Sequence, residues 1–337
     1  MKQLKHNLMS GKNRIPWIDT LKALGMFFIV LGHFFPPYLS AWIYTFNVPL
    51  FFFVSGFLSK REEGWNTFWR KNVKGLVIPF LCLSLLINTP YIIGHATDAR
   101  RMLYLFGGII LGFHSVDGMY GCLNMWFVYC LFLVKVLFQY SSRSRGQMFA
   151  LTVACMVGMT VYHVLGLHVK WALSNVLYAL PFFMLGYGCR QKAWFTAHTA
   201  SEGSRPWDIA VAMLAVCSAF AATHNGIAYT YEGGVGNHLA IFTLCSLVNL
   251  LLMVRSACLL QHYMQRSVRL IARGSILILA FHLVALYPAG NLIRRLTASN
   301  QLLEVMAFIF ASLLICVLFI PVIQFVKKHV PLLMGGR

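Results

Sequence analysis

Near the start of the chain, residues 17–59 read WIDTLKALGMFFIVLGHFFPPYLSAWIYTFNVPLFFFVSGFLS. This stretch holds two apolar runs on either side of a Pro-Pro break, each able to cross a bilayer as a helix of roughly 20 residues. Similar runs recur along the 337-residue chain, whereas the alternating segments of a membrane β-barrel do not. The chain is 59% apolar and only 11% charged, too little charge for the surface of a soluble domain. The sequence therefore predicts an all-α polytopic transmembrane helix bundle.

We expect about ten spans, at 17–37, 41–59, 75–95, 124–141, 147–165, 171–190, 206–223, 237–256, 271–289 and 301–326. The stretch 102–113, MLYLFGGIILGF, is apolar but short, and we expect it to be re-entrant or interfacial. Neither a linker nor a repeat divides the sequence, so residues 1–337 are predicted to form a single integral-membrane domain.

The distribution of Lys and Arg predicts the orientation of the spans. With the N-terminus inside, 20 of the 28 cations fall in inner segments, 5 in outer segments and 3 (Lys22, Lys135 and Arg273) within spans. Such asymmetry in short loops indicates that both termini are cytoplasmic. The net charge of +19 follows from the same asymmetry, since cations in inner loops contact membrane lipids of the inner leaflet. We therefore expect no nucleic-acid partner.

Ionisable residues at membrane depth are costly and are therefore candidates for function. In the first span, Asp19, Lys22, Met26, Ile29 and His33 recur at intervals of three and four and share one helical face. Eleven residues separate the lysine from the histidine, which is about 16 Å along a helix. We call this row of five side chains the stripe. The alternative to a functional stripe is a structural ion pair beside a packed histidine, because the aspartate and the lysine can pair.

The second span is interrupted by Pro49 and Gly56. A proline frees backbone carbonyls, which membranes tolerate only where protein or a wet cavity receives them. We therefore expect a cavity beside the His33 face, lined by Asn47 and Ser55; the alternative is an ordinary proline kink.

Three cations, Arg70, Lys71 and Lys74, stand at the cytoplasmic end of the third span. Grouped cations can bind phosphates, although positive flanks of spans look the same. The nine cysteines form no CxxC pair, and HxxxH and HExxH spacings do not occur. We therefore expect neither disulfides nor a bound metal.

The pattern DTLKALGMFFIVLGH followed by FNVPLFFFVSGF resembles the membrane-bound acyltransferase-3 family, and within it the fucose 4-O-acetylase-like branch. The family motif of a basic residue, ten residues and a histidine falls on Lys22 and His33, and its R-x-x-R motif falls on Lys71 and Lys74. Asn47 stands where FHMPLFF, frequent in that branch, has a histidine. Later segments agree: NMWFVYCLF around Trp126, LPFFMLGYG around Gly186, and ILILAFH ending at His282.

The resemblance implies a multi-pass enzyme of the bacterial inner membrane that moves an acyl group, acetyl above all, from cytoplasmic acyl-CoA to a glycan or lipid-linked sugar. Arg70, Lys71 and Lys74 would hold the phosphates of acetyl-CoA, and the pantetheine arm would follow the stripe from Lys22 to His33. The histidine would act as a general base or as an acyl acceptor.

Further residues are expected to contact the substrate. Trp126, at the start of the fourth span, would stack on sugar, unless it belongs to the interfacial aromatic belt. His282 would orient His33, bind sugar or act as a second base, unless it is simply packed. The loop 224–236, rich in aromatics and glycine, is either a carbohydrate-binding loop or flexible.

Two functions from other classes stay open at this level. One is a membrane carrier of a lipid or polar solute without acyl-transfer chemistry, and the other is a non-catalytic partner of a glycan export machine. Paired interrupted helices in corresponding halves of the chain, a mark of carriers, are not apparent in the sequence.

Overall fold

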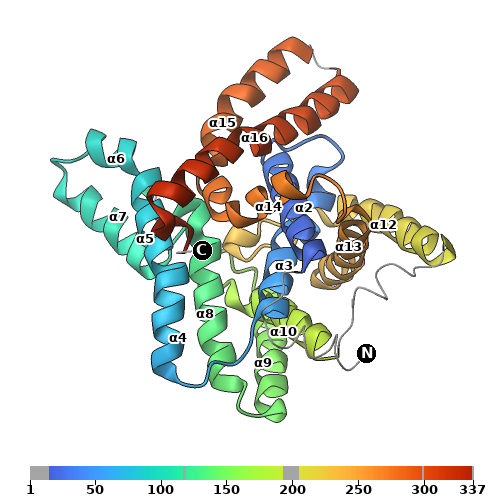
Figure 1. Ribbon diagram of the computed structural model, residues 1–337, viewed down its shortest axis with the longest axis horizontal. Helices are drawn as coiled ribbons and strands as arrows, with labels where there is room; N and C mark the ends of the chain where they lie inside the picture. Colours follow the sequence, from blue (N-terminus) through green and yellow to red (C-terminus); the bar gives the residue numbers. More distant parts are fainter. Residues whose placement is uncertain (1–14, 117–118, 193–204, 298–299, 336–337) are drawn as a thin grey trace.

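The computed structural model describes residues 15–116, 119–192, 205–297 and 300–335. The first half of the chain folds into the helices α2 (Pro16–His33), α3 (Ser40–Leu58), α4 (Trp65–Asn72), η1 (Val73–Val77), α5 (Ile78–Ile87), α6 (Thr89–Gly94), α7 (Ala99–Leu111), η2 (Leu123–Met125) and α8 (Trp126–Ser141). The second half folds into α9 (Arg145–Val164), α10 (Val176–Gln191), α12 (Arg205–Asn225), η3 (Thr230–Glu232), α13 (Leu239–Leu260), α14 (Gln265–Arg273), α15 (Ser275–Thr297), α16 (Gln301–His329) and η4 (Pro331–Met334). Figure 1 shows their arrangement.

Within this described part, the strands are limited to one short antiparallel hairpin. It consists of β1 (Ser115–Val116) and β2 (Met119–Tyr120) and follows α7. The rest of the fold is helical, as predicted.

Seven described helical segments are long and apolar enough to cross a membrane: α3, Leu123–Ser141, α9, α12, α13, α15 and α16. They confirm a polytopic helical membrane protein. The other three predicted spans also form helices. However, α2 carries Asp19, Lys22 and His33, α10 has only 16 residues, and 75–95 is divided among η1, α5 and α6. The total of ten spans and the cytoplasmic placement of both ends stay predictions.

The stretch 102–113 lies mostly in α7, a 13-residue helix whose N-cap is Asp98 and whose C-cap is Gly112. The aspartate side chain accepts a hydrogen bond from the Arg101 backbone amide at 3.0 Å, a common N-cap contact. At the other end, a left-handed Gly112 (φ 77°) stops the helix. The hydrogen bond from the Cys122 amide to the Phe113 carbonyl then joins the end of this segment to the start of η2.

Two glycines bring α3 and α10 into close contact. A Cβ added at Gly56 would lie 1.8 Å from the Phe183 carbonyl oxygen, and one added at Gly186 would lie 2.0 Å from the Phe53 carbonyl oxygen. Only glycine permits such an approach of two backbones, and small residues commonly serve this purpose between membrane helices. This contact fixes α3, which carries Pro49 within a continuous helix.

A buried polar cluster connects α3 with α12 and α13. Asn249 Oδ1 accepts hydrogen bonds from Trp42 Nε1 at 2.8 Å and from Ser218 Oγ at 3.1 Å, while its Nδ2 donates to Thr45 Oγ1 at 3.2 Å. Hydrogen bonds between side chains of different helices stabilise a bundle where no water is present to satisfy these groups.

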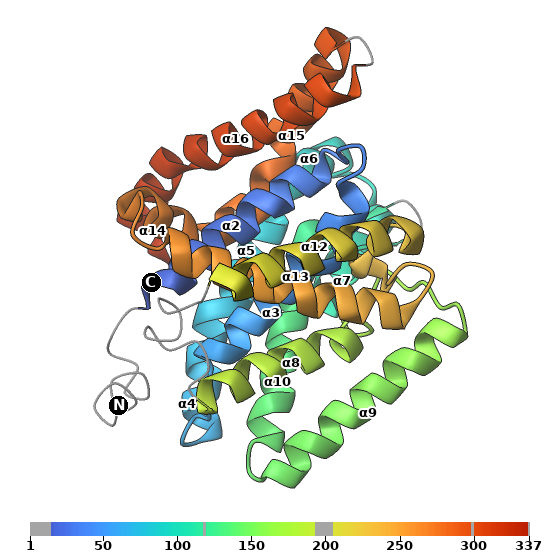
Figure 2. The ribbon, with the colours of Figure 1, turned by 90° about the vertical axis from the view of Figure 1, so that its right-hand side faces the viewer.

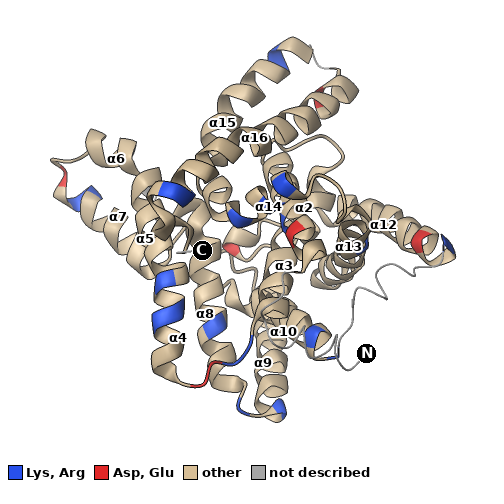
Figure 3. Cartoon of the chain, viewed as in Figure 1, with Lys and Arg blue, Asp and Glu red and all other residues tan. Residues whose placement is uncertain are grey.

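Short helices and basic residues gather at one end of the bundle. In Figure 2, α4, α14 and the start of α2 lie on the left, where the chain also ends. Figure 3 shows Lys and Arg on α4 and α14, whereas the long helices are largely uncharged along their length. That this end lies on the inner side of the membrane stays a prediction.

Candidate functional site

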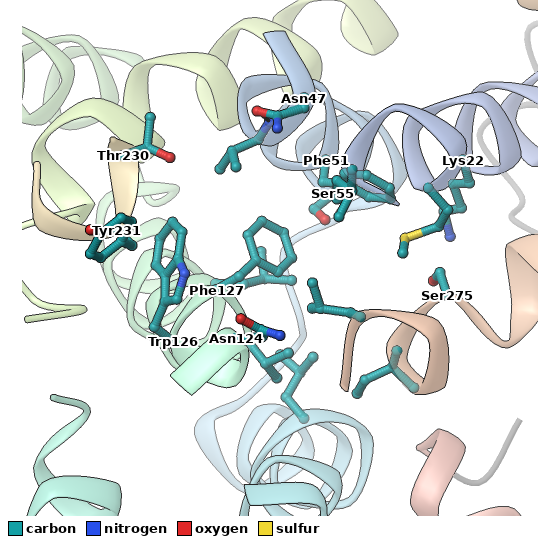
Figure 4. A pocket seen from close by; sticks show the side chains of 18 of the residues that line it. Lys22, Asn47, Phe51, Ser55, Asn124, Trp126, Phe127, Thr230, Tyr231 and Ser275 are labelled. Atoms are coloured by element: carbon teal, nitrogen blue, oxygen red, sulfur yellow. Dashed lines mark hydrogen bonds between the residues drawn. The ribbon is translucent and has the colours of Figure 1, made fainter. Parts of the chain in front are cut away.

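A cavity of about 1260 Å³ runs through the centre of the bundle. Its walls come from α2, α3, α8 and α15, with η1, α14 and η3 contributing at its ends. In Figure 4, Lys22 and Ser275 lie on one side of the view, and Thr230 and Tyr231 lie on the opposite side. Phe51, Phe127 and Trp126 lie between them.

The stripe predicted on the first span faces this cavity. Asp19, Lys22, Met26, Ile29 and His33 all line it, because α2 is a regular helix that keeps residues three and four apart on one face. The cavity thus extends along α2 from its first turn to its last residue.

His33 is half-buried, and its environment fixes which ring nitrogen carries a proton. Nδ1 lies 2.7 Å from the Ile29 carbonyl oxygen, and a carbonyl can only accept, so Nδ1–H is the donor. In the neutral imidazole the lone pair then resides on Nε2. A histidine held in this tautomer is suited to accept a proton from a substrate.

His282 packs against His33 with a ring-centroid distance of 4.7 Å in an edge-to-face arrangement. It is completely buried and does not line the cavity. Its Nδ1 lies 2.9 Å from the Ile278 carbonyl oxygen, and its buried Nε2 has no hydrogen-bond partner among the described residues. Of the roles expected for His282, this position suits the support of His33 better than direct contact with sugar.

The end of the cavity that is rich in cations, called here the basic end, is lined by Lys22, Lys60, Lys71, Lys135 and Arg273. Asp19 and Glu62 are the only carboxylates among all the described lining residues. Positive charge therefore predominates at this end, which suits it to a polyanionic ligand.

Two hydrogen bonds hold the loop after α3 against α8 at the basic end. The Glu62 amide donates to Gln139 Oε1 at 3.1 Å, and Gln139 Nε2 donates to the Glu62 carbonyl at 3.0 Å. The carboxylate of Glu62 pairs with Lys71. This arrangement places Lys71 at the cavity wall.

Of the three predicted phosphate-binding cations, only Lys71 lines the cavity. Arg70 and Lys74 are exposed and lie outside the lining. Adjacent residues of a helix point about 100° apart, and the helix changes from α4 to the π-helical turn η1 directly after Asn72. The structure therefore brings only one of the three cations to the cavity.

Lys135 and Arg273 come from α8 and α14 and were not predicted as site residues. Both line the cavity. Their signal was present in the sequence, because with Lys22 they are the cations within predicted spans, where a charge needs a compensating environment. The sequence did not show that all three face the same cavity.

The opposite end of the cavity, called here the histidine end, carries a chain of ring contacts. Ring centroids are 6.3 Å apart between His33 and Tyr44, 6.1 Å between Tyr44 and Tyr229, 6.1 Å between Tyr229 and Tyr231, and 4.7 Å between Tyr231 and His114. Burial, followed by the charge of Lys170, lowers the pKa of His114 to about 4, so its ring is neutral at pH 7. Such a surface offers aromatic faces and hydrogen-bonding groups to a sugar.

The loop that carries Tyr229 and Tyr231 is held in place by hydrogen bonds. Asn175 Nδ2 donates to the Tyr231 carbonyl at 3.2 Å, and the Tyr162 hydroxyl donates to the Glu232 carbonyl at 3.3 Å. Asn225 Nδ2 donates to the Val235 carbonyl at 2.8 Å. These bonds place the aromatic side chains of the loop 224–236 at the cavity, and its binding of carbohydrate stays a prediction.

The remaining predicted contacts, Asn47, Ser55 and Trp126, all line the cavity between its two ends. Asn47 is buried, and its Oδ1 accepts a hydrogen bond from the Val48 amide at 2.8 Å. Its amide nitrogen is thereby the group left to face a ligand. The structure brings these residues together, and their contact with substrate stays a prediction.

Metal-ligating side chains do not cluster in this site. The described residues contain no group of three or more His, Cys, Asp or Glu that could hold a metal ion. All nine cysteines, which lie within the described ranges, are free thiols.

The protein is a membrane protein with a buried ligand site. Its spanning helices surround a cavity that has cations at one end and imidazoles and phenols at the other. The family model of the acyltransferase domain matches residues 15–320, nearly the whole chain. The chain therefore belongs to the acyltransferase-3 family, and it is a multi-pass membrane acyltransferase. A carrier without acyl-transfer chemistry does not fit this family. Comparisons with curated proteins and with solved structures find no match.

Proposed function

We propose that the protein transfers an acetyl group from cytoplasmic acetyl-CoA to a hydroxyl of a cell-surface or exported glycan, within the bacterial inner membrane. The observation that supports this proposal is a single cavity lined both by Lys71, Lys135 and Arg273 and by His33, His114 and Tyr231. One ligand site thus combines cations for a nucleotide phosphate with a base and aromatic rings for a sugar.

The donor would bind with its phosphates at the basic end. Lysine and arginine bind phosphate by charge and by hydrogen bonds, and Lys71, Lys135 and Arg273 reach the cavity from separate elements. The pantetheine arm would extend along α2, where Lys22 and His33 are about 16 Å apart by helix geometry. The thioester would then lie beside His33.

The acceptor would bind at the histidine end, with its ring against Tyr229 and Tyr231. In the transfer, His33 Nε2 takes the proton of the sugar hydroxyl while the hydroxyl oxygen attacks the thioester carbonyl. The carbon–sulfur bond breaks, the acetyl group stays on the sugar oxygen, and the departing thiolate receives the proton from His33. A second route forms an acetyl-histidine first, with the same net change.

The proposal is tested with the purified protein in vesicles, [¹⁴C]acetyl-CoA and membranes from cells that lack the protein. Release of CoA together with transfer of label to a glycan fraction, lost in His33→Gln, supports the proposal. Transfer that requires another acyl-CoA would revise the donor. A full rate in the variant would remove His33 from the mechanism.

A further inference from the structure

The histidine end of the cavity has an exposed border. Four residues that line it are also exposed on the protein surface: Phe35 (45%), Tyr287 (65%), Asn291 and Arg294. Three of them belong to α15, where they recur at intervals of four and three. The cavity is therefore open along one edge of this helix.

The depth of this opening follows from the contacts between α15 and α2. Arg294 Nη2 donates to the Phe34 carbonyl at 2.9 Å, and a Cβ added at Gly290 would lie 3.4 Å from the Phe34 ring. The end of α2 is thus level with residues 290–294 of α15. Tyr287 lies about one turn further into the bundle, between this level and that of His282, whose ring contacts His33.

The opening lies on a different side of α15 from the contact of this helix with α2. His282 and Gly290 close one side of α15 against α2, whereas Tyr287 borders Val284, which is 72% exposed and does not line the cavity. Because α15 is one of the helices long and apolar enough to span a membrane, we expect exposed apolar residues in its middle, such as Val284, to face lipid. In a bilayer, the opening beside Tyr287 would then lead sideways into lipid.

The opening leads to His33 past aromatic rings. Phe35 has a positive φ of 52°, a conformation that costs energy for a bulky residue and persists where the surroundings enforce it. Its ring stacks on Tyr44 at 5.8 Å, and Tyr44 lies next to His33. Arg294 and the exposed Arg295 stand in the last turn of α15, on the side of Tyr287 away from the basic end.

We infer that the acceptor is a sugar carried on a membrane lipid through a phosphate, which reaches His33 sideways through this opening. The lipid chain would remain in the bilayer outside Tyr287. The sugar would pass Phe35 to the rings of the histidine end. The phosphate would lie near Arg295 and near Arg294, whose Nε also pairs with Glu304 at 3.6 Å. The inference rests on the proposed acyl transfer and adds the acceptor class and its route.

The route is tested by spin labels in vesicles, in a background without Cys82 and Cys217, the two native cysteines that are not buried. A label on Tyr287→Cys is expected to be more accessible to oxygen, which concentrates in lipid, than to a water-soluble nickel chelate. Val284→Cys serves as the lipid-facing control and Asn124→Cys as the cavity control. Greater access of the chelate at position 287 would show an opening to water and would overturn the inference.

The acceptor class is tested in native membranes with [¹⁴C]acetyl-CoA. Label is expected first in the fraction that organic solvent extracts, and a bulky maleimide on Tyr287→Cys should reduce this transfer at least tenfold while the same reagent on Val284→Cys leaves it unchanged. Label that appears only in water-soluble polysaccharide would overturn the lipid-borne acceptor. Absence of both transfer and CoA release in unmodified protein would instead refute the proposed function.

Discussion

Replacement of His33 by glutamine tests the proposed base directly. Glutamine has a similar size and can still donate to the Ile29 carbonyl, which the Nδ1 of His33 contacts at 2.7 Å, so the packing against Tyr44 and His282 is largely retained. It cannot take a proton from a hydroxyl. General-base catalysis contributes about 10²–10⁴-fold, and the rate constant for acetyl transfer should fall by that factor. This corresponds to about 3–5 kcal/mol of transition-state stabilisation.

The assay follows CoA release and glycan labelling at saturating acetyl-CoA in vesicles. Binding of the donor at the basic end should be unchanged, so the Kd for CoA is expected to stay within about twofold. His262→Gln, an exposed histidine between α13 and α14 that does not line the cavity, is the matched control and should keep the wild-type rate. The reasoning is refuted by a His33→Gln variant that retains more than a tenth of the rate, or by one that loses activity because CoA no longer binds.

Three other predictions concern different parts of the molecule. Gly186→Ala should lower the free energy of unfolding by at least the roughly 1–3 kcal/mol usual for overpacking, because its Cβ would lie 2.0 Å from a backbone carbonyl of α3. Gly188→Ala, whose Cβ would have nothing within 4 Å, should leave the melting temperature unchanged. Because the pKa of His114 is lowered to about 4, the unfolded chain binds a proton that the folded one lacks between pH 6.5 and 4. Melting in detergent should therefore show stability that falls below pH 6.5, by at most about 2 kcal/mol at pH 5, and His114→Gln should reduce this loss. Lys135→Gln should raise the KM for acetyl-CoA about tenfold, the value of one hydrogen bond to a charged group, whereas Arg70→Gln, exposed and outside the cavity, should change it less than threefold.

Several properties follow from the sequence by itself. The membrane-spanning class follows from the length of the apolar runs, because lipid requires each backbone to satisfy its own hydrogen bonds in a helix. The stripe from Asp19 to His33 was also predictable, since a helix repeats its faces every three to four residues. The positions of these side chains along the cavity agree with that periodicity.

The composition of the site was decided by tertiary structure. Lys71, Lys135 and Arg273 lie far apart in the chain, and only the tertiary arrangement of α4, α8 and α14 brings them to one cavity. The contact of His282 with His33, at 4.7 Å, and the side opening at Tyr287 depend on how α15 packs against α2. The periodicity of a sequence predicts which residues share a face of one helix. Which other helix packs against that face depends on close packing between helices, which the sequence pattern does not encode.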